Sequence, residues 1–180
     1  AHHHAGQHQP GQGPQRQPRL PQGQAGEQGD QRAASRHALR DAAAHPGAKG
    51  LRVAIFLSVF AVPVKQTPLA GRVVSLERGG TRFLAAWNPR GERENVRLAL
   101  ELELADGRRI VVTQITGLIA RRIVCHAKVG EWLPRGVRYG LIRFGSRTDV
   151  LLPPGSVATV KVGDRVRGGA SILARLGVPE

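Results

Sequence analysis

The chain has 180 residues, enough for one ordinary domain, and a formal net charge of +14. Its one cysteine, Cys125, excludes an internal disulfide and argues against a cysteine-based metal cluster. The charge does not choose among nucleic acid, an anionic membrane face, and a soluble domain that is simply rich in surface arginine.

The first 50 residues differ in composition from the rest. Their large aliphatic residues are Leu20 and Leu39, and they contain no Val, Ile, Phe, Tyr or Trp. Such a segment cannot bury enough apolar surface to offset the entropy of ordering. We therefore expect 1–50 to be a disordered low-complexity tail and 51–180 to be the folded unit. A GC-rich coding region read in the wrong frame gives the same composition, and the sequence leaves both interpretations open.

Two observations bear on membranes and secretion. The tail shows no apolar stretch of the kind that forms a secretory signal, so we expect none. The longest apolar run, 53–64, is 12 residues long and includes Ser58 and Pro63, whereas a spanning helix needs about 20. We expect any membrane contact to be peripheral and the setting to be cytoplasmic.

The folded part is predicted to be mainly β. Apolar and polar residues alternate over 96–105, Asp106-Gly107 follows, and a second apolar run covers 110–115, which together predict a hairpin. A short helix is also expected at 117–123. Other apolar runs, separated by turns at 134–136 and 153–155, predict strands at 52–56, 71–76, 82–86, 139–144 and 148–152.

The C-terminal part, 155–176, resembles the end of a barrel-sandwich fold such as that of lipoyl and biotinyl modules. Those carriers place a modified lysine at a hairpin tip, usually beside methionine. This chain has no methionine, and Lys161 lies within a strand pattern. The likeness therefore concerns the fold and not a carrier function.

The dipeptide Gly145-Ser146 follows the strand predicted at 139–144. On its own a Gly-Ser pair is typical of a surface turn, but the surrounding phrase 140–150, GLIRFGSRTDV, resembles the processing segment of short, archaeal-type phosphatidylserine decarboxylases. Three more phrases resemble the same family in the same order: IFLSVF at 55–60, ENV at 94–96 and GLIARRIVC at 117–125.

The resemblance implies a phosphatidylserine decarboxylase-like β fold and a self-cleaving proenzyme. The Ser146 hydroxyl would attack the carbonyl of Gly145, whose missing Cβ tolerates a strained backbone. Elimination and loss of ammonia would leave fragments 1–145 and 146–180, the second beginning with a pyruvoyl group derived from Ser146. That group would form a Schiff base with phosphatidylserine and act as an electron sink while carbon dioxide leaves, giving phosphatidylethanolamine.

The same resemblance implies an anionic phospholipid substrate at the cytoplasmic face of the cell membrane. Arginines bind phosphate and carboxylate oxygens bidentately, so Arg143, Arg147 and Arg122 are the candidate substrate-binding residues. Arg121 is adjacent to Arg122 and cannot share its face, so at most one of the two serves the site. No metal ion and no cofactor beyond the pyruvoyl group are expected.

The general base of the reaction is where the sequence departs from the family. Members carry a phrase of the form FDVHVNR-x-P, and the matching residues 60–68 read FAVPVKQTP. Ala61 stands in place of the aspartate, Pro63 in place of the histidine and Gln66 in place of the arginine. A Pro-Ala-Asp-Gly loop expected upstream has no match in 1–50. Proline can neither accept nor donate a proton, so self-cleavage lacks its usual activator.

Three other residues were weighed for roles in chemistry. His126 is the one histidine of 51–180 and is expected to pack rather than to act as a base. Asp149 lies three residues after Ser146, so strand alternation points the two side chains to opposite faces. Cys125, in an apolar run, is expected to be a buried structural thiol.

Two alternatives to an active decarboxylase stay open on the sequence. One is a catalytically impaired relative that binds anionic lipid without processing itself. The other is a basic nucleic-acid-binding protein, which is less favoured because 51–180 lacks the interleaved basic and aromatic residues that stack on bases.

Overall fold

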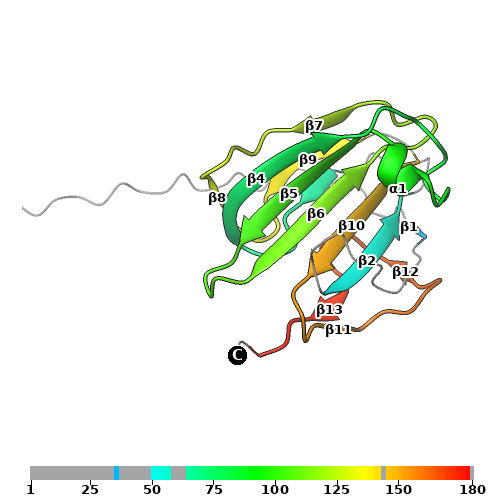
Figure 1. The fold of residues 1–180 in the computed structure, drawn as a ribbon. Helices are drawn as coiled ribbons and strands as arrows, with labels where there is room; N and C mark the ends of the chain where they lie inside the picture. Colours follow the sequence, from blue (N-terminus) through cyan, green and yellow to red (C-terminus); the bar gives the residue numbers. More distant parts are fainter. Residues whose placement is uncertain (1–34, 37–49, 58–63, 143–144, 179–180) are drawn as a thin grey trace, which may run out of the picture.

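The computed structural model describes residues 35–36, 50–57, 64–142 and 145–178, the side chains of 35–36 excepted. The largest element of the fold is a six-stranded antiparallel sheet (Figure 1). Its strands, in spatial order, are β2 (Leu51–Phe56), β10 (Arg147–Leu152), β6 (Arg109–Ile115), β5 (Arg97–Glu103), β4 (Gly71–Gly79) and β8 (Trp132–Leu133). The mainly β fold predicted from the alternating pattern is confirmed.

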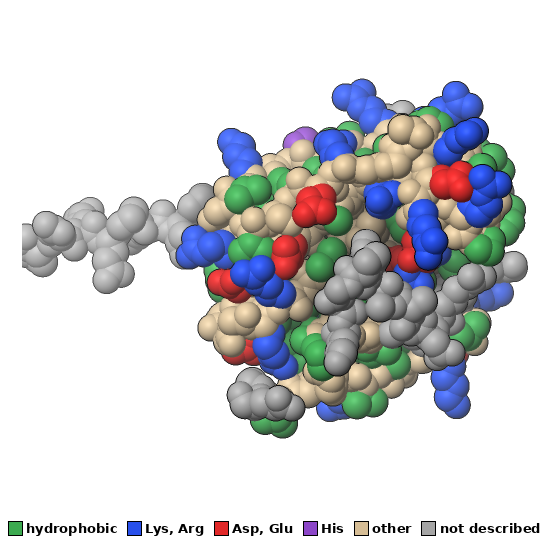
Figure 2. All heavy atoms as spheres, viewed as in Figure 1, with side chains coloured by type: hydrophobic (Ala, Val, Ile, Leu, Met, Phe, Trp, Pro, Cys, Tyr) green, Lys and Arg blue, Asp and Glu red, His purple; other side chains and the backbone are tan. Residues whose placement is uncertain are grey.

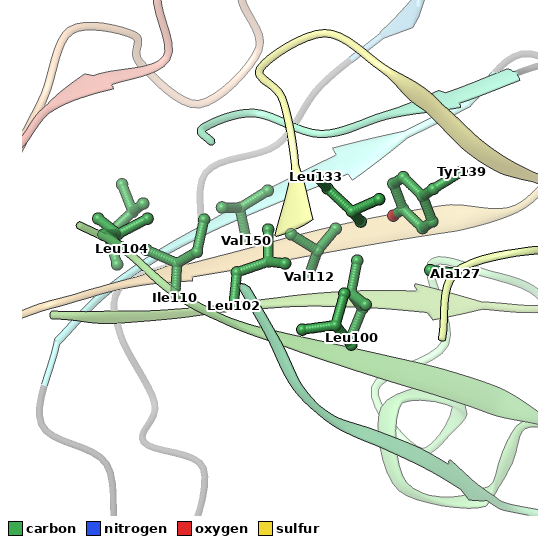
Figure 3. Packing of buried hydrophobic residues seen from close by; sticks show 11 residues of the cluster. Leu100, Leu102, Leu104, Ile110, Val112, Ala127, Leu133, Tyr139 and Val150 are labelled. Carbon is green, nitrogen blue, oxygen red and sulfur yellow. The ribbon is translucent and has the colours of Figure 1, made fainter. Parts of the chain in front are cut away.

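A second, three-stranded sheet packs against one face of the first. It contains β3 (Val64–Gln66), β9 (Arg138–Ile142) and β7 (Ile123–Cys125). The core lies between the two sheets: Leu100, Val112, Val150 and Leu133 from the large sheet pack with Tyr139 from β9, as Figure 3 shows. Each of these five side chains is at most 5% exposed, because alternate residues of a strand share one face.

The C-terminal residues form shorter pairs. β11 (Val157–Ala158) pairs with β13 (Ala174–Arg175), and β12 (Arg165–Val166) pairs with β1 (Ser35–Arg36). Residues 35–36 of the tail therefore join the sheet structure. The rest of 1–49 lies outside the described residues, so the proposed boundary at residue 50 stays a prediction.

Most of the predicted strands are confirmed, and two elements are wrong. The hairpin at Asp106-Gly107 joins β5 to β6 as expected, with Gly107 at φ 80°. The segment 82–86 makes only a single bridge, from Arg82 to Asn95. The side-chain amide of buried Asn95 accepts a hydrogen bond from the Leu84 N–H and donates one to the Leu84 carbonyl, so these two backbone groups are not available to a neighbouring strand. The helix expected at 117–123 is absent: irregular chain leads into β7.

The helix α1 (Gly91–Glu94) is a single turn at the end of the large sheet opposite to β8 (Figure 1). It carries Glu92 to the sheet face that the three-stranded sheet does not cover. Among the described residues no helix is both long and apolar enough to cross a bilayer.

Candidate functional site

The Gly145-Ser146 bond lies at the start of β10, next to the end of β6. The last pair of the ladder is Arg147 with Ile115. Continuing the antiparallel register by one rung brings Ser146 opposite Thr116, and by two rungs Gly145 opposite Gly117. The second rung is supported directly, because a Cβ on Gly117 would stand 2.0 Å from the carbonyl oxygen of Gly145.

The backbone at this bond has the geometry that the sequence predicted. Gly145 has a φ of 63°, in the left-handed region that favours glycine. The carbonyl of Ser146 accepts a hydrogen bond from the Leu57 N–H at 2.8 Å, which extends the pairing of β10 with β2. The Gly145-Ser146 bond is therefore held on both sides, by the chain that follows β2 and by the chain that follows β6. The Gly145 carbonyl lies against the Cα of Gly117.

The Ser146 side chain is fully buried, and its hydroxyl has no hydrogen-bond partner within the described part of the chain. Among the described residues, the Thr116 hydroxyl opposite to it is also buried without a hydrogen-bond partner, as are both polar atoms of the Gln114 amide. Leaving a buried polar group unsatisfied costs about 1–3 kcal/mol, so such groups call for an explanation. Their concentration around one serine indicates a site built for a reacting group.

A lysine completes this polar end of the ladder. Thr148 lies two residues after Ser146 and pairs with Gln114. Its hydroxyl accepts a hydrogen bond of 2.7 Å from the Nζ of Lys65, which is 6% exposed. Desolvation by burial lowers the pKa of Lys65 from 10.5 to about 7. Lys65 comes from β3, so both sheets contribute to the site.

The sequence alone did not identify Lys65, Thr116, Gln114 or Gly117 as site residues. Gln114 offered one signal, a polar residue on the inward face of an otherwise apolar strand. Lys65 offered another, a charged residue directly after the apolar run 53–64, in the phrase 60–68 that departs from the family. Neither signal reveals a partner, because Lys65 and Thr148 are 83 positions apart.

Arg147 is held by the fold instead of facing a ligand. Its guanidinium donates to both Asp149 carboxylate oxygens, at 2.6 and 2.5 Å, and reaches Glu92 at 3.4 Å. The ring of Phe56 lies 5.5 Å from the guanidinium carbon. With only 2% of the side chain exposed, Arg147 has no free face for a lipid phosphate, and we assign it a structural role.

Arg52 joins the same buried network through Glu92 and, at 3.9 Å, Asp149. Burial raises the pKa of Asp149, although both arginines oppose that shift. Partial burial opposes ionisation of Glu92 as well, but hydrogen bonds and charge from Arg52 and Arg147 leave its pKa lowered. The network lies on the opposite sheet face from Ser146, which confirms that Asp149 points away from the serine.

The remaining candidates are on the surface or outside the described residues. Arg122 is exposed, and Arg121 is exposed with its guanidinium 5.6 Å from the Phe83 ring. His126 is exposed too, so the packing role expected for it is wrong, and it does not share the buried environment of Ser146.

Cys125 is half-buried, and burial raises the pKa of its thiol. Arg143, Ala61 and Pro63 lie outside the described residues.

Comparison with known proteins identifies relatives of this chain. Residues 25–174 match the family model described as phosphatidylserine decarboxylase. A phosphatidylserine decarboxylase proenzyme of Pelobacter propionicus is 49% identical over 131 residues, which is 73% of this chain and 60% of the relative. Proenzymes of the same name from Mycobacterium marinum and Burkholderia ambifaria are 47% and 44% identical, covering 69% and 71% of this chain and 52% and 60% of the relatives.

The chain thus spans between about half and three fifths of the length of these relatives. No solved structure matches it.

Proposed function

The chain belongs to the phosphatidylserine decarboxylase family, and from this premise we propose that it cleaves itself between Gly145 and Ser146 and then decarboxylates phosphatidylserine to phosphatidylethanolamine. The observation that carries the proposal is the Gly145-Ser146 bond itself. A buried hydroxyl, which has no hydrogen-bond partner among the described residues, follows a carbonyl that is fixed in place by Gly117. The alternatives, a lipid-binding relative without processing and a nucleic-acid-binding protein, gain no support from the comparisons.

The surroundings of Ser146 also fit the pyruvoyl group on which the family depends. A pyruvoyl carbonyl accepts hydrogen bonds, and the Thr116 hydroxyl and Gln114 amide are buried donors that have no hydrogen-bond partner in the part of the chain that the structure describes. These two residues would hold the group at the start of the 146–180 fragment. When formed, it supplies an electron sink for loss of carbon dioxide from the substrate.

Self-cleavage is tested by the mass of the purified chain. We expect two fragments, 1–145 and 146–180, with carbon dioxide released from phosphatidylserine vesicles. Ser146→Ala should stay a single 19.3 kDa chain and release none. Ser156→Ala is the matched control, because that hydroxyl only bonds the Pro153 carbonyl in a turn. An intact wild-type chain that releases no carbon dioxide would overturn the proposal.

For the substrate headgroup we propose Arg122 as a binding residue, because it is exposed and makes no ion pair with a described residue. Arg143, which is adjacent in sequence to the site, stays a second candidate. Arginine suits this role because its guanidinium matches phosphate and carboxylate in a bidentate geometry. The proposal predicts a higher KM for phosphatidylserine in Arg122→Gln with unchanged self-cleavage.

We further propose that the chain docks on the cytoplasmic face of the membrane through the end of the sheet that carries α1. Trp87, Leu118 and Ile119 are 70%, 56% and 64% exposed there. The segments that present them are in contact, because a Cβ on Gly117 would lie 3.6 Å from that of Ala86. Figure 2 shows apolar and basic side chains gathered at this end of the molecule.

The charge around these apolar residues suits an anionic bilayer. Five exposed arginines are carried by the same segments: Arg82, Arg90, Arg93, Arg121 and Arg122. Tryptophan prefers the headgroup region, and each basic residue near an anionic surface adds about 1 kcal/mol. Docking here would place the membrane beside the Gly117–Gly145 contact.

Vesicle sedimentation tests the docking surface. We expect the double variant Trp87→Ser, Ile119→Ser to lose binding to vesicles that contain phosphatidylserine. Trp132→Ser is the matched control, because Trp132 is also exposed, at 47%, but lies on β8 at the other end of the sheet. Equal loss in both variants, or in neither, would contradict the assignment.

A further inference from the structure

Lys65 is a buried amine whose hydrogen-bond partner among the described residues is a hydroxyl and not a carboxylate. Its Nζ donates to Thr148 Oγ1 at 2.7 Å, and no described residue forms an ion pair with it. An ammonium group removed from water without a counter-charge is costly, so burial favours the neutral amine, and the pKa is lowered to about 7. A neutral amine carries a lone pair that accepts a proton.

Lys65 lies on the same face of the large sheet as Ser146. Thr148 and Ser146 are alternate residues of one strand, so their side chains share a face. Opposite them are Gln114 and Thr116, whose side chains lack partners within the described chain. The next rung is apolar, Val150 with Val112. The polar residues are therefore confined to the end of the ladder that holds the serine.

The other titratable groups that face this region do not serve as proton acceptors. Burial raises the pKa of Tyr139, which packs from β9, and of Cys125, which packs from β7, so both stay protonated near neutral pH. The carboxylates Asp149 and Glu92 lie on the opposite face and are bound by arginines. Arg52 and Arg147, the other buried cations, belong to that same network.

We propose that the amine of Lys65 accepts the proton of the Ser146 hydroxyl during self-cleavage and returns it to the departing nitrogen. The inference rests on the proposed function and adds the base that it requires. Two residues along a strand are about 7 Å apart. Rotation of the flexible lysine stem, or one bridging water, closes that gap.

The step balances without another reactant. The Ser146 Oγ attacks the carbonyl carbon of Gly145 as its proton passes to Lys65. The bond from that carbon to the Ser146 nitrogen then breaks, and the Lys65 ammonium gives its proton to the freed amine. The product is an ester between Gly145 and the Ser146 side chain, with Lys65 neutral again.

The rate of cleavage against pH tests this role. Chain made by cell-free translation is shifted to buffers from pH 5.5 to 9, and the two fragments are followed by intact mass. We expect the wild-type rate to rise with a midpoint near pH 7, as the neutral amine becomes available. Lys65→Arg keeps the charge but stays protonated, and should slow cleavage by about 100-fold or more. The exposed Lys128→Arg is the matched control and should cleave at the wild-type rate.

A titration of the amine gives a readout independent of cleavage. In the uncleaved Ser146→Ala chain, the NMR signal of the Lys65 side chain should titrate near pH 7. A Lys65 amine that is fully charged up to pH 9 overturns the proposal, even if variants at position 65 fold poorly. So does cleavage of Lys65→Arg at the wild-type rate and midpoint. Absence of cleavage in the wild-type chain instead overturns the proposed function.

Discussion

The carbonyl oxygen of Gly145 lies against the Cα of Gly117, where any Cβ would stand 2.0 Å from it. Gly117 lies just after the end of β6 and Gly145 just before the start of β10, so the position of the bond to be cut is set by the chain that leaves β6 as well as by the chain that enters β10. Strained or crowded backbone at a reacting bond is a recurring way to fix its geometry.

Gly117→Ala is expected to slow cleavage at Gly145 by 10-fold or more, because the added methyl group must displace the carbonyl that Ser146 attacks. The measurement is the mass of the chain over time after cell-free synthesis. Gly50→Ala is a closely matched control: its Cβ would lie 2.1 Å from the Leu152 carbonyl, at the other end of β10. Equal slowing in both variants would point to general damage to the strand.

The pH dependence of stability provides a second prediction. Between pH 7 and 10.5 the unfolded chain binds a proton at Lys65 that the folded chain does not, so stability rises with pH across that window. Below pH 7 the full penalty of burying the ammonium group applies, at most roughly 5 kcal/mol for a shift from 10.5 to about 7.

Lys65→Met should therefore stabilise the uncleaved Ser146→Ala chain most at pH 6 and progressively less toward pH 10. Urea unfolding at several pH values measures the difference. Lys128→Met, at an exposed position, should show no such trend. A difference that does not change with pH would mean that Lys65 is not depressed in pKa by the fold.

The buried network around Arg147 gives a third prediction. Asp149→Asn removes the carboxylate that binds this guanidinium at 2.5 Å, leaving a buried charge with only the longer contact to Glu92. We expect a loss of about 3 kcal/mol in the free energy of unfolding, measured in urea on the Ser146→Ala chain. Glu103→Gln, which removes an exposed partner of Arg109, should cost about 0.5 kcal/mol or less.

Asn95 holds the chain next to Gly117 in place, and a fourth prediction concerns its side chain. Its side chain is fully buried, accepts from the Leu84 N–H at 2.7 Å, and donates at 2.8 Å to the carbonyls of Leu84 and Thr116. Asn95→Leu leaves those three groups without partners and frees the chain just before Gly117. We expect slower cleavage and faster amide exchange at Leu84, with neither effect in Asn88→Ala, whose side chain only caps an exposed turn.

Much of the fold was predictable because strand patterns are local. The alternation over 96–105 and the Asp-Gly turn predicted the β5–β6 hairpin, since side-chain period and turn chemistry are set by neighbouring residues. The strand expected at 82–86 failed because a single distant side chain, Asn95, occupies its backbone groups. The helix expected at 117–123 failed because 117–122 is irregular chain and its last residue, Ile123, starts the pairing of β7 with β9.

The candidate site divides in the same way. By itself the sequence determined the family, the mainly β character and the Gly145-Ser146 bond, because these depend on residues that are contiguous in the chain. Only the tertiary structure decided that Gly117 fixes the scissile carbonyl, that Arg147 is held by Asp149 and Glu92, and that Lys65 meets Thr148. These lysine, glycine and arginine residues acquire their roles from burial and from partners far along the chain. A local sequence pattern encodes neither the burial nor the partners.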